Sequence, residues 1–111
     1  MNKIYLIAPV LMLAGCNQQD DRICEVPKND FEADSCLHRN AYLMGDAEGS
    51  IKDIATAVVA RCNLEINKDY MSKVEIRDVT DEAIQAHYAD ALDTAKRRII
   101  ESIAGKCDKP E

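Results

Sequence analysis

The residues of this chain with the clearest capacity for chemistry are its five cysteines. A cysteine thiol can form a disulfide, ligate a metal ion, act as a nucleophile or carry a lipid. Cysteines spaced as Cys-x-x-Cys are typical of zinc sites, and no two of these five are that close. Metal binding is therefore the alternative to disulfide formation rather than the first expectation. The positions are Cys16, Cys24, Cys36, Cys62 and Cys107.

Cys16 differs from the other four because of the residues that precede it. Residues 1–3 (MNK) form a basic start, and residues 4–13 (IYLIAPVLML) form an apolar run. Residues 13–15 (LAG) then end in small side chains directly before Cys16. A basic start, a short apolar run and small residues at the cut are the layout of a secretory signal peptide. With a cysteine directly after the cut, residues 1–16 resemble a bacterial lipoprotein precursor.

This resemblance implies a processing path and an address. In lipoproteins of this class the sulfur corresponding to Cys16 receives a diacylglycerol, the preceding peptide (here 1–15) is removed, and the new amino group is usually acylated. One acyl chain holds a protein only marginally at a membrane, whereas two or more hold it stably. In this class an aspartate directly after the lipidated cysteine retains the protein at the inner membrane, and this chain has Asn17 at that position. The expected location is therefore the periplasmic face of the outer membrane.

Three other interpretations of the first segment are open. Residues 1–15 would be an ordinary signal peptide if Cys16 were incidental. A transmembrane helix is less well supported, because the apolar run is about half of the roughly 20 residues that span a bilayer and contains Pro9. A buried core helix conflicts with the basic start and with the small residues before Cys16.

Composition indicates a single small exported domain. Removal of residues 1–15 would leave residues 16–111 with 13 basic and 20 acidic side chains, a formal charge of −7. That charge opposes nucleic acid and anionic lipid surfaces unless it is segregated, so no nucleic-acid partner is expected. With no Trp and one Phe the core is thin, and small exported domains of this kind are usually stabilised by disulfides. The four cysteines after Cys16 therefore predict two disulfides.

Hydrophobic periodicity predicts an all-α domain of three helices. The first spans about 30–44 and can be capped by Asn29 or Asp30, with Asn29 and Glu32 as a variant capping box. The second spans about 50–70, is capped by Ser50 and has a stripe that continues into the mid-seventies. The third, about 80–106, begins at Thr80. Strand-like alternation occurs in one stretch, residues 73–79. We expect a lipidated tether over residues 16–29, followed by the helical domain over residues 30–111.

Three pairings of the four remaining cysteines can be drawn. Cys36 lies about ten residues before the first interhelical turn and Cys62 about thirteen after it. At the rise of a helix these are roughly 15 and 19 Å from the turn, on the apolar stripes of antiparallel neighbours. Cys36–Cys62 is therefore the preferred pair. Cys24–Cys107 follows and would clip the tether to the end of the third helix.

The other candidates for chemistry have structural explanations. His38 and His87 are the only histidines and lack a ligand spacing such as H-E-x-x-H. The serines have no nucleophile motif, and the glycines form no phosphate loop. Acidic pairs and the Lys96-Arg97-Arg98 run are typical of solvated helix faces. The sequence therefore predicts no catalytic residue, no metal ligand and no cofactor.

Two hypotheses of function follow. The first is a small lipid-anchored envelope protein that acts as a non-catalytic interaction or accessory module for an unidentified envelope protein. The alternative is a small-ligand or metal-binding lipoprotein that uses His38, His87 and acidic residues in an interhelical cleft. An enzyme would be a third hypothesis, with no motif to support it.

Overall fold

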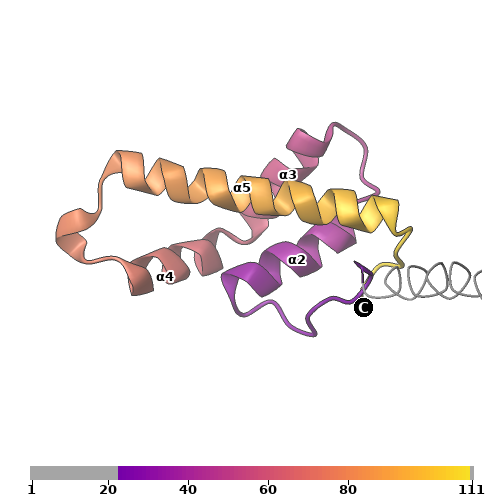
Figure 1. Ribbon diagram of the computed structural model, residues 1–111, viewed down its shortest axis with the longest axis horizontal. Helices are drawn as coiled ribbons and strands as arrows, with labels where there is room; N and C mark the ends of the chain where they lie inside the picture. The colour runs from indigo at the N-terminus through magenta and orange to yellow at the C-terminus, as the bar shows by residue number, and fades with distance from the viewer. Residues whose placement is uncertain (1–22, 111) are drawn as a thin grey trace, which may run out of the picture.

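The chain folds as an assembly of α-helices around one long C-terminal helix. A computed structural model describes residues 23–110, and within that range no strand is present. The all-α class predicted from periodicity is confirmed. The elements are α2 (Ala33–Met44), α3 (Ile51–Arg61), α4 (Asn63–Lys73), the 3₁₀ turn η1 (Ile76–Asp78) and α5 (Asp81–Ala104) (Figure 1). Residues 73–79, which carried the strand-like alternation, contain the end of α4 and η1.

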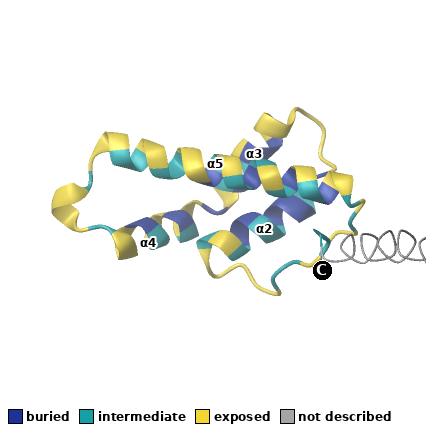
Figure 2. Ribbon diagram, in the orientation of Figure 1, coloured by how far each residue is buried: buried dark blue, intermediate teal, exposed yellow. Residues whose placement is uncertain are grey.

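Helix α5 runs the length of the fold, and the other helices pack along it in two groups. α2 and α3 lie against its C-terminal part, and α4 lies beside its N-terminal part and runs in the opposite direction (Figure 1). The buried positions face this long helix (Figure 2). Alanines with no exposed surface lie on α2, α3 and α5, and their small side chains let the backbones approach closely. The fully or almost fully enclosed side chains are Cys36, Leu37, Ala41, Tyr42, Ala55, Val58, Cys62, Ile66, Ala95 and Ile99.

The helix expected over 50–70 is divided at Cys62. α3 ends at Arg61 and α4 begins at Asn63, with Cys62 at φ −98° and ψ 12° between them. The Cys62 N–H is 3.1 Å from the carbonyl oxygens of both Val58 and Val59, so the last turn of α3 is tightened. Only one residue leaves helical geometry, so Ile66 remains in the core. The apolar stripe in the sequence gives no sign of this break, because the helical spacing of the apolar residues continues unchanged across it.

Both predicted disulfides are confirmed. Cys36 of α2 is bonded to Cys62, with their Cα atoms 5.8 Å apart, and both are enclosed in the core. Cys24 is bonded to Cys107 with a Cα separation of 5.2 Å. The first bond ties α2 to the junction of α3 and α4. The second ties the N-terminal segment to the residues that follow α5.

Two of the three predicted helix caps are confirmed. The hydroxyl of Ser50 accepts a hydrogen bond from the Asp53 N–H at 3.1 Å, and that of Thr80 accepts one from the Ala83 N–H at 3.0 Å. The third prediction, a capping box from Asn29 to Glu32, is wrong. Instead, the Asn29 side-chain oxygen accepts a hydrogen bond from the Phe31 N–H at 3.3 Å. This local turn competes with helix, so α2 begins only at Ala33.

The segment from Ile23 to Pro27 is held against the helices. Besides the Cys24–Cys107 bond, the Tyr42 hydroxyl donates to the Ile23 carbonyl, and Arg39 Nη1 donates to the Pro27 carbonyl at 3.2 Å. Val26 packs against the core. Cys16 and the rest of residues 1–22 lie outside the described residues, as does residue 111. Within residues 23–110, no helix combines the length and apolarity needed to cross a bilayer.

Candidate functional site

The candidate site is a pocket between α4 and the N-terminal half of α5. These helices are joined through η1 and lie side by side, while most of the α5 core contacts are made further along, to α2 and α3 (Figures 1 and 2). A volume of about 120 Å³ is left between them. It is lined by Asn67, Tyr70, Met71, Val79, Ile84, His87 and Tyr88. The lining is largely apolar with a few polar groups, which is the usual composition of a binding pocket.

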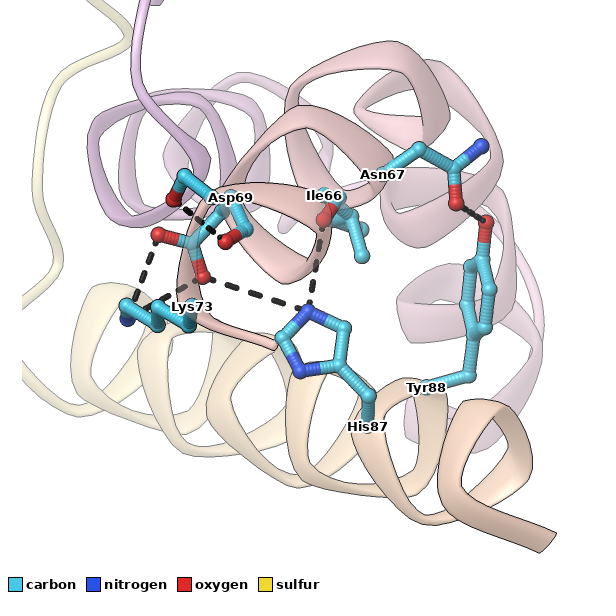
Figure 3. Close-up of polar contacts among 7 residues, drawn as sticks. Ile66, Asn67, Asp69, Lys73, His87 and Tyr88 are labelled. Atoms are coloured by element: carbon cyan, nitrogen blue, oxygen red, sulfur yellow. Dashed lines mark hydrogen bonds and ion pairs between the residues drawn. The ribbon is translucent and has the colours of Figure 1, made fainter. Parts of the chain in front are cut away.

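His87 is fixed on one wall of this pocket. Its Nε2 is 3.3 Å from the carbonyl oxygen of Ile66 and 3.9 Å from Asp69 Oδ2 (Figure 3). Its ring lies 4.9 Å, centroid to centroid, from that of Tyr70. Asp69 also forms an ion pair with Lys73 at 3.2 Å. The imidazole therefore links α5 to α4, and its Nε2 is already engaged with a main-chain oxygen.

Tyr88 makes a second link between the two helices. Its hydroxyl donates to Asn67 Oδ1 at 2.7 Å (Figure 3). The hydroxyl also contacts Asn63 Oδ1. Both asparagines belong to α4, one turn apart. The tyrosine and the histidine, neighbours on α5, thus hold the two sides of the pocket at a set spacing.

Tyr70 is the buried member of the lining. Its side chain is 7 % exposed, and its hydroxyl has no hydrogen-bond partner within residues 23–110. An enclosed polar group without a partner costs about 1–3 kcal/mol. The pocket wall therefore contains a group that reduces the stability of the fold.

Replacing Tyr70 by Phe should increase stability. We expect Tyr70→Phe to raise the free energy of unfolding by about 1 kcal/mol, because the ring stays and the unsatisfied hydroxyl is removed. Tyr88→Phe is the matched control and should lower it by up to about 1 kcal/mol, because its hydroxyl is hydrogen-bonded. Urea unfolding followed by circular dichroism measures both. A loss of stability in Tyr70→Phe equal to that in Tyr88→Phe would contradict this account.

His38 lies in a different part of the fold. It is on α2, with its ring 4.9 Å from that of Tyr42 in an edge-on arrangement. Burial lowers its pKa, and the positive charge of Arg98 on α5 lowers it further. Arg98 itself pairs with Glu101 at 3.0 Å. His38 does not line the α4–α5 pocket, so the structure does not bring the two histidines together there.

The other residues singled out in the sequence are distributed over the surface or used in the fold. Within residues 23–110 no group of three or more His, Cys, Asp or Glu side chains is placed to hold a metal ion. Of the basic run in α5, Arg97 is exposed and Arg98 faces Glu101, so the run divides between two directions. Cys24, Cys36, Cys62 and Cys107 are all in disulfides. Cys16, the predicted lipidation site, lies outside the described residues.

Sequence reasoning missed the pocket itself. Ile84 and Tyr88 have the helical spacing of a core stripe in the third helix, and Asn67 and Met71 belong to no recognisable motif. The available signal was that the second helix becomes more polar after Cys62, with asparagines at 63 and 67. A helix with a weakened apolar face packs less completely against its neighbour.

The chain was also compared with known proteins. It matches no protein-family model, no curated protein and no solved structure.

Proposed function

We propose that this chain is a small lipid-anchored protein of the bacterial cell envelope that acts as a non-catalytic interaction or accessory module on the periplasmic face. The observation that carries the proposal is the Leu-Ala-Gly-Cys sequence at 13–16 after a signal-peptide layout. The anchor would be a diacylglycerol on Cys16, with the mature chain beginning there.

The arrangement of the described residues supports a short link between such an anchor and the helices. Seven backbone steps separate Cys16 from Ile23, and fully extended chain covers at most about 25 Å over that length. Ile23 and Cys24 are held at the C-terminal end of α5. That end would stay close to the membrane. The α4–η1 end lies at the opposite end of the fold (Figure 1) and would face away from the lipid.

A non-catalytic role is supported by how the two histidines are used. His87 engages a main-chain carbonyl and stacks near Tyr70, and His38 packs on Tyr42. His87 therefore links α5 to α4, whereas His38 packs on a residue of its own helix, α2. General acid–base chemistry needs a ring nitrogen that can exchange a proton with a bound group, and Nε2 of His87, the histidine that lines the pocket, is 3.3 Å from the Ile66 carbonyl oxygen.

A second candidate function is the binding of a small ligand, and the observation that favours it is the pocket of about 120 Å³ between α4 and α5. Zinc, copper and small aromatic compounds can be titrated against the purified protein by calorimetry. Saturable heat that Ile84→Trp abolishes, in a variant with a native circular dichroism spectrum, would support this alternative.

The anchor is tested by replacing its attachment point. We expect Cys16→Ser to abolish incorporation of labelled palmitate and to move the protein from the membrane to the soluble fraction, because the thiol that accepts the lipid is lost. Asn17→Asp is the control, and it should keep the label while favouring the inner membrane. Unchanged labelling and membrane fractionation in Cys16→Ser would refute the anchor.

A further inference from the structure

We propose that the α4–η1–α5 end of the fold is a docking surface for a basic segment of a partner protein, which inserts one apolar side chain into the α4–α5 pocket. This inference rests on the proposed role as an interaction module, and it names the surface and the chemistry of the partner. We call this surface the distal surface. It comprises the pocket, the exposed aliphatic side chains beside it, and the carboxylates of residues 75–82.

The distal surface exposes aliphatic side chains that the fold does not use. Leu64 is 60 % exposed, Met71 is 53 % exposed and Ile76 is 83 % exposed. Leu64 and Met71 are seven residues apart on α4 and therefore share a face of that helix. Met71 also lines the pocket. Exposed apolar groups that continue into a pocket are typical of interaction sites, whereas isolated ones need no explanation.

The pocket has the size of one side chain. Its volume is about 120 Å³, and all of its lining residues except Asn67 are aliphatic or aromatic. For comparison, an apolar cavity of about 150 Å³ binds a benzene ring. One aromatic or branched aliphatic side chain is therefore a suitable occupant. Anchors of this kind, buried at the centre of an interface, carry most of the binding energy in protein complexes.

The charge around the pocket selects a basic partner. Residues 63–94 hold eight acidic and three basic side chains, whereas residues 95–110 hold two acidic and five basic. Residues 23–62 hold seven acidic and four basic side chains, so the distal part is the most acidic of the three. We call three carboxylates beside the pocket the rim: Asp78, Asp81 and Glu82. They are exposed and form no ion pair with any residue of the described range 23–110. Complementary charge steers encounter and suppresses wrong partners.

The same charge argues against the other occupants of such a surface. In a symmetric dimer a second copy of this chain would bring an equally acidic distal surface against the first, and an anionic membrane would repel that surface. Two carboxylates of the rim, Asp81 and Glu82, also favour the N-terminus of α5. Asp78 lies before that helix, in η1, and has no such role. A cationic protein segment is therefore the occupant that fits both the pocket and its rim.

The test is site-specific photo-crosslinking of the full-length protein in cells. A benzophenone amino acid is placed at Met71, beside the pocket, or at Ile100, a control position that is 51 % exposed on the basic half of α5. We expect an adduct at Met71 that is at least fivefold stronger than at Ile100. The crosslinked partner peptide, identified by mass spectrometry, should carry an excess of Lys and Arg.

Matched charge variants separate docking from chance proximity. Neutralising the rim with Asp78→Asn, Asp81→Asn and Glu82→Gln should reduce the Met71 adduct about tenfold, because three screened attractions are lost together. Neutralising Glu25, Glu48 and Asp108, which are exposed outside residues 63–94, should leave it unchanged. Circular dichroism of both triple variants verifies that they fold.

Four outcomes would overturn the proposal: no adduct at Met71, equal adducts at Met71 and Ile100, an adduct with a second copy of the chain, or an adduct insensitive to the rim variants. The result is separable from that for the anchor. Palmitate labelling of Cys16 without a Met71 adduct leaves the anchor in place and removes the docking surface. A rim-dependent adduct without palmitate labelling supports the docking surface and removes the anchor.

Discussion

Removing the Cys36–Cys62 disulfide is expected to lower the free energy of unfolding by about 3.5 kcal/mol. The bond closes a loop with a sequence separation of 26, and the figure is the chain entropy that the unfolded state regains when such a loop opens. Domains of this size have total stabilities of about 5–15 kcal/mol. The double variant Cys36→Ala/Cys62→Ala should therefore melt roughly 15–25 °C below the parent protein.

The surroundings of this bond make the loss larger rather than smaller. Both cysteines are enclosed in the core. The buried Asn40 side chain donates to the Cys36 carbonyl at 2.9 Å, and its Nδ2 is also 3.3 Å from Cys36 Sγ and 3.6 Å from Cys62 Sγ. Removing the sulfur atoms takes contacts from a buried polar group and leaves a cavity beside it. Thermal and urea unfolding followed by circular dichroism measure the effect. A melting temperature within about 5 °C of the parent would show that the chain-entropy account fails here.

Removing the Cys24–Cys107 disulfide is expected to cost about 4 kcal/mol and to release the N-terminal segment. Its sequence separation is 83, which alone corresponds to about 4.5 kcal/mol, and the Cys36–Cys62 bond nested inside it shortens the effective loop. In Cys24→Ala/Cys107→Ala, the segment would keep non-covalent contacts such as the hydrogen bonds from Tyr42 and Arg39 and the packing of Val26. We therefore expect faster tryptic cleavage after the exposed Lys28, at temperatures where the helices remain folded.

Partial reduction provides a control that changes no residue. Cys24 and Cys107 are half-buried, whereas Cys36 and Cys62 are at most 2 % exposed. A thiolate must reach a sulfur atom to break a disulfide, so mild reduction should open Cys24–Cys107 first and reproduce the cleavage after Lys28. Earlier reduction of Cys36–Cys62, found by alkylation and peptide mapping, would contradict this order. If the protein is lipid-anchored as proposed, loss of the outer bond would lengthen the link between the attachment point and the helices, and that link would then run through the released segment to α2.

The features predicted correctly from sequence depend on neighbouring residues. Ser50 and Thr80 cap helices because a hydroxyl can reach an N–H three residues on whatever the rest of the chain does. The same locality explains the failure at Asn29, where two local hydrogen bonds compete and the tighter turn is formed. The preferred disulfide pairing was also correct. Two antiparallel helices with cysteines at similar distances from their turn leave little choice.

The helix break at Cys62 and the candidate site depend instead on residues far apart in the chain. The break depends on a residue that is held by a disulfide to another helix while its N–H is shared between two carbonyls. The pocket depends on how far α4 stands from α5, which is set by His87 and Tyr88 reaching across to α4. Neither the break nor the distance between α4 and α5 is encoded in the spacing of residues along one helix.

The amino-acid sequence by itself determined the helical class, the caps at Ser50 and Thr80, and the charge excess of residues 63–94, because periodicity, capping and charge are properties of short segments. The tertiary structure alone decided that His38 and His87 do not share a pocket, that α4 is a separate helix, and that a pocket remains beside exposed aliphatic side chains. These features arise from contacts between residues far apart in the chain. Their geometry exists only when the helices are packed together.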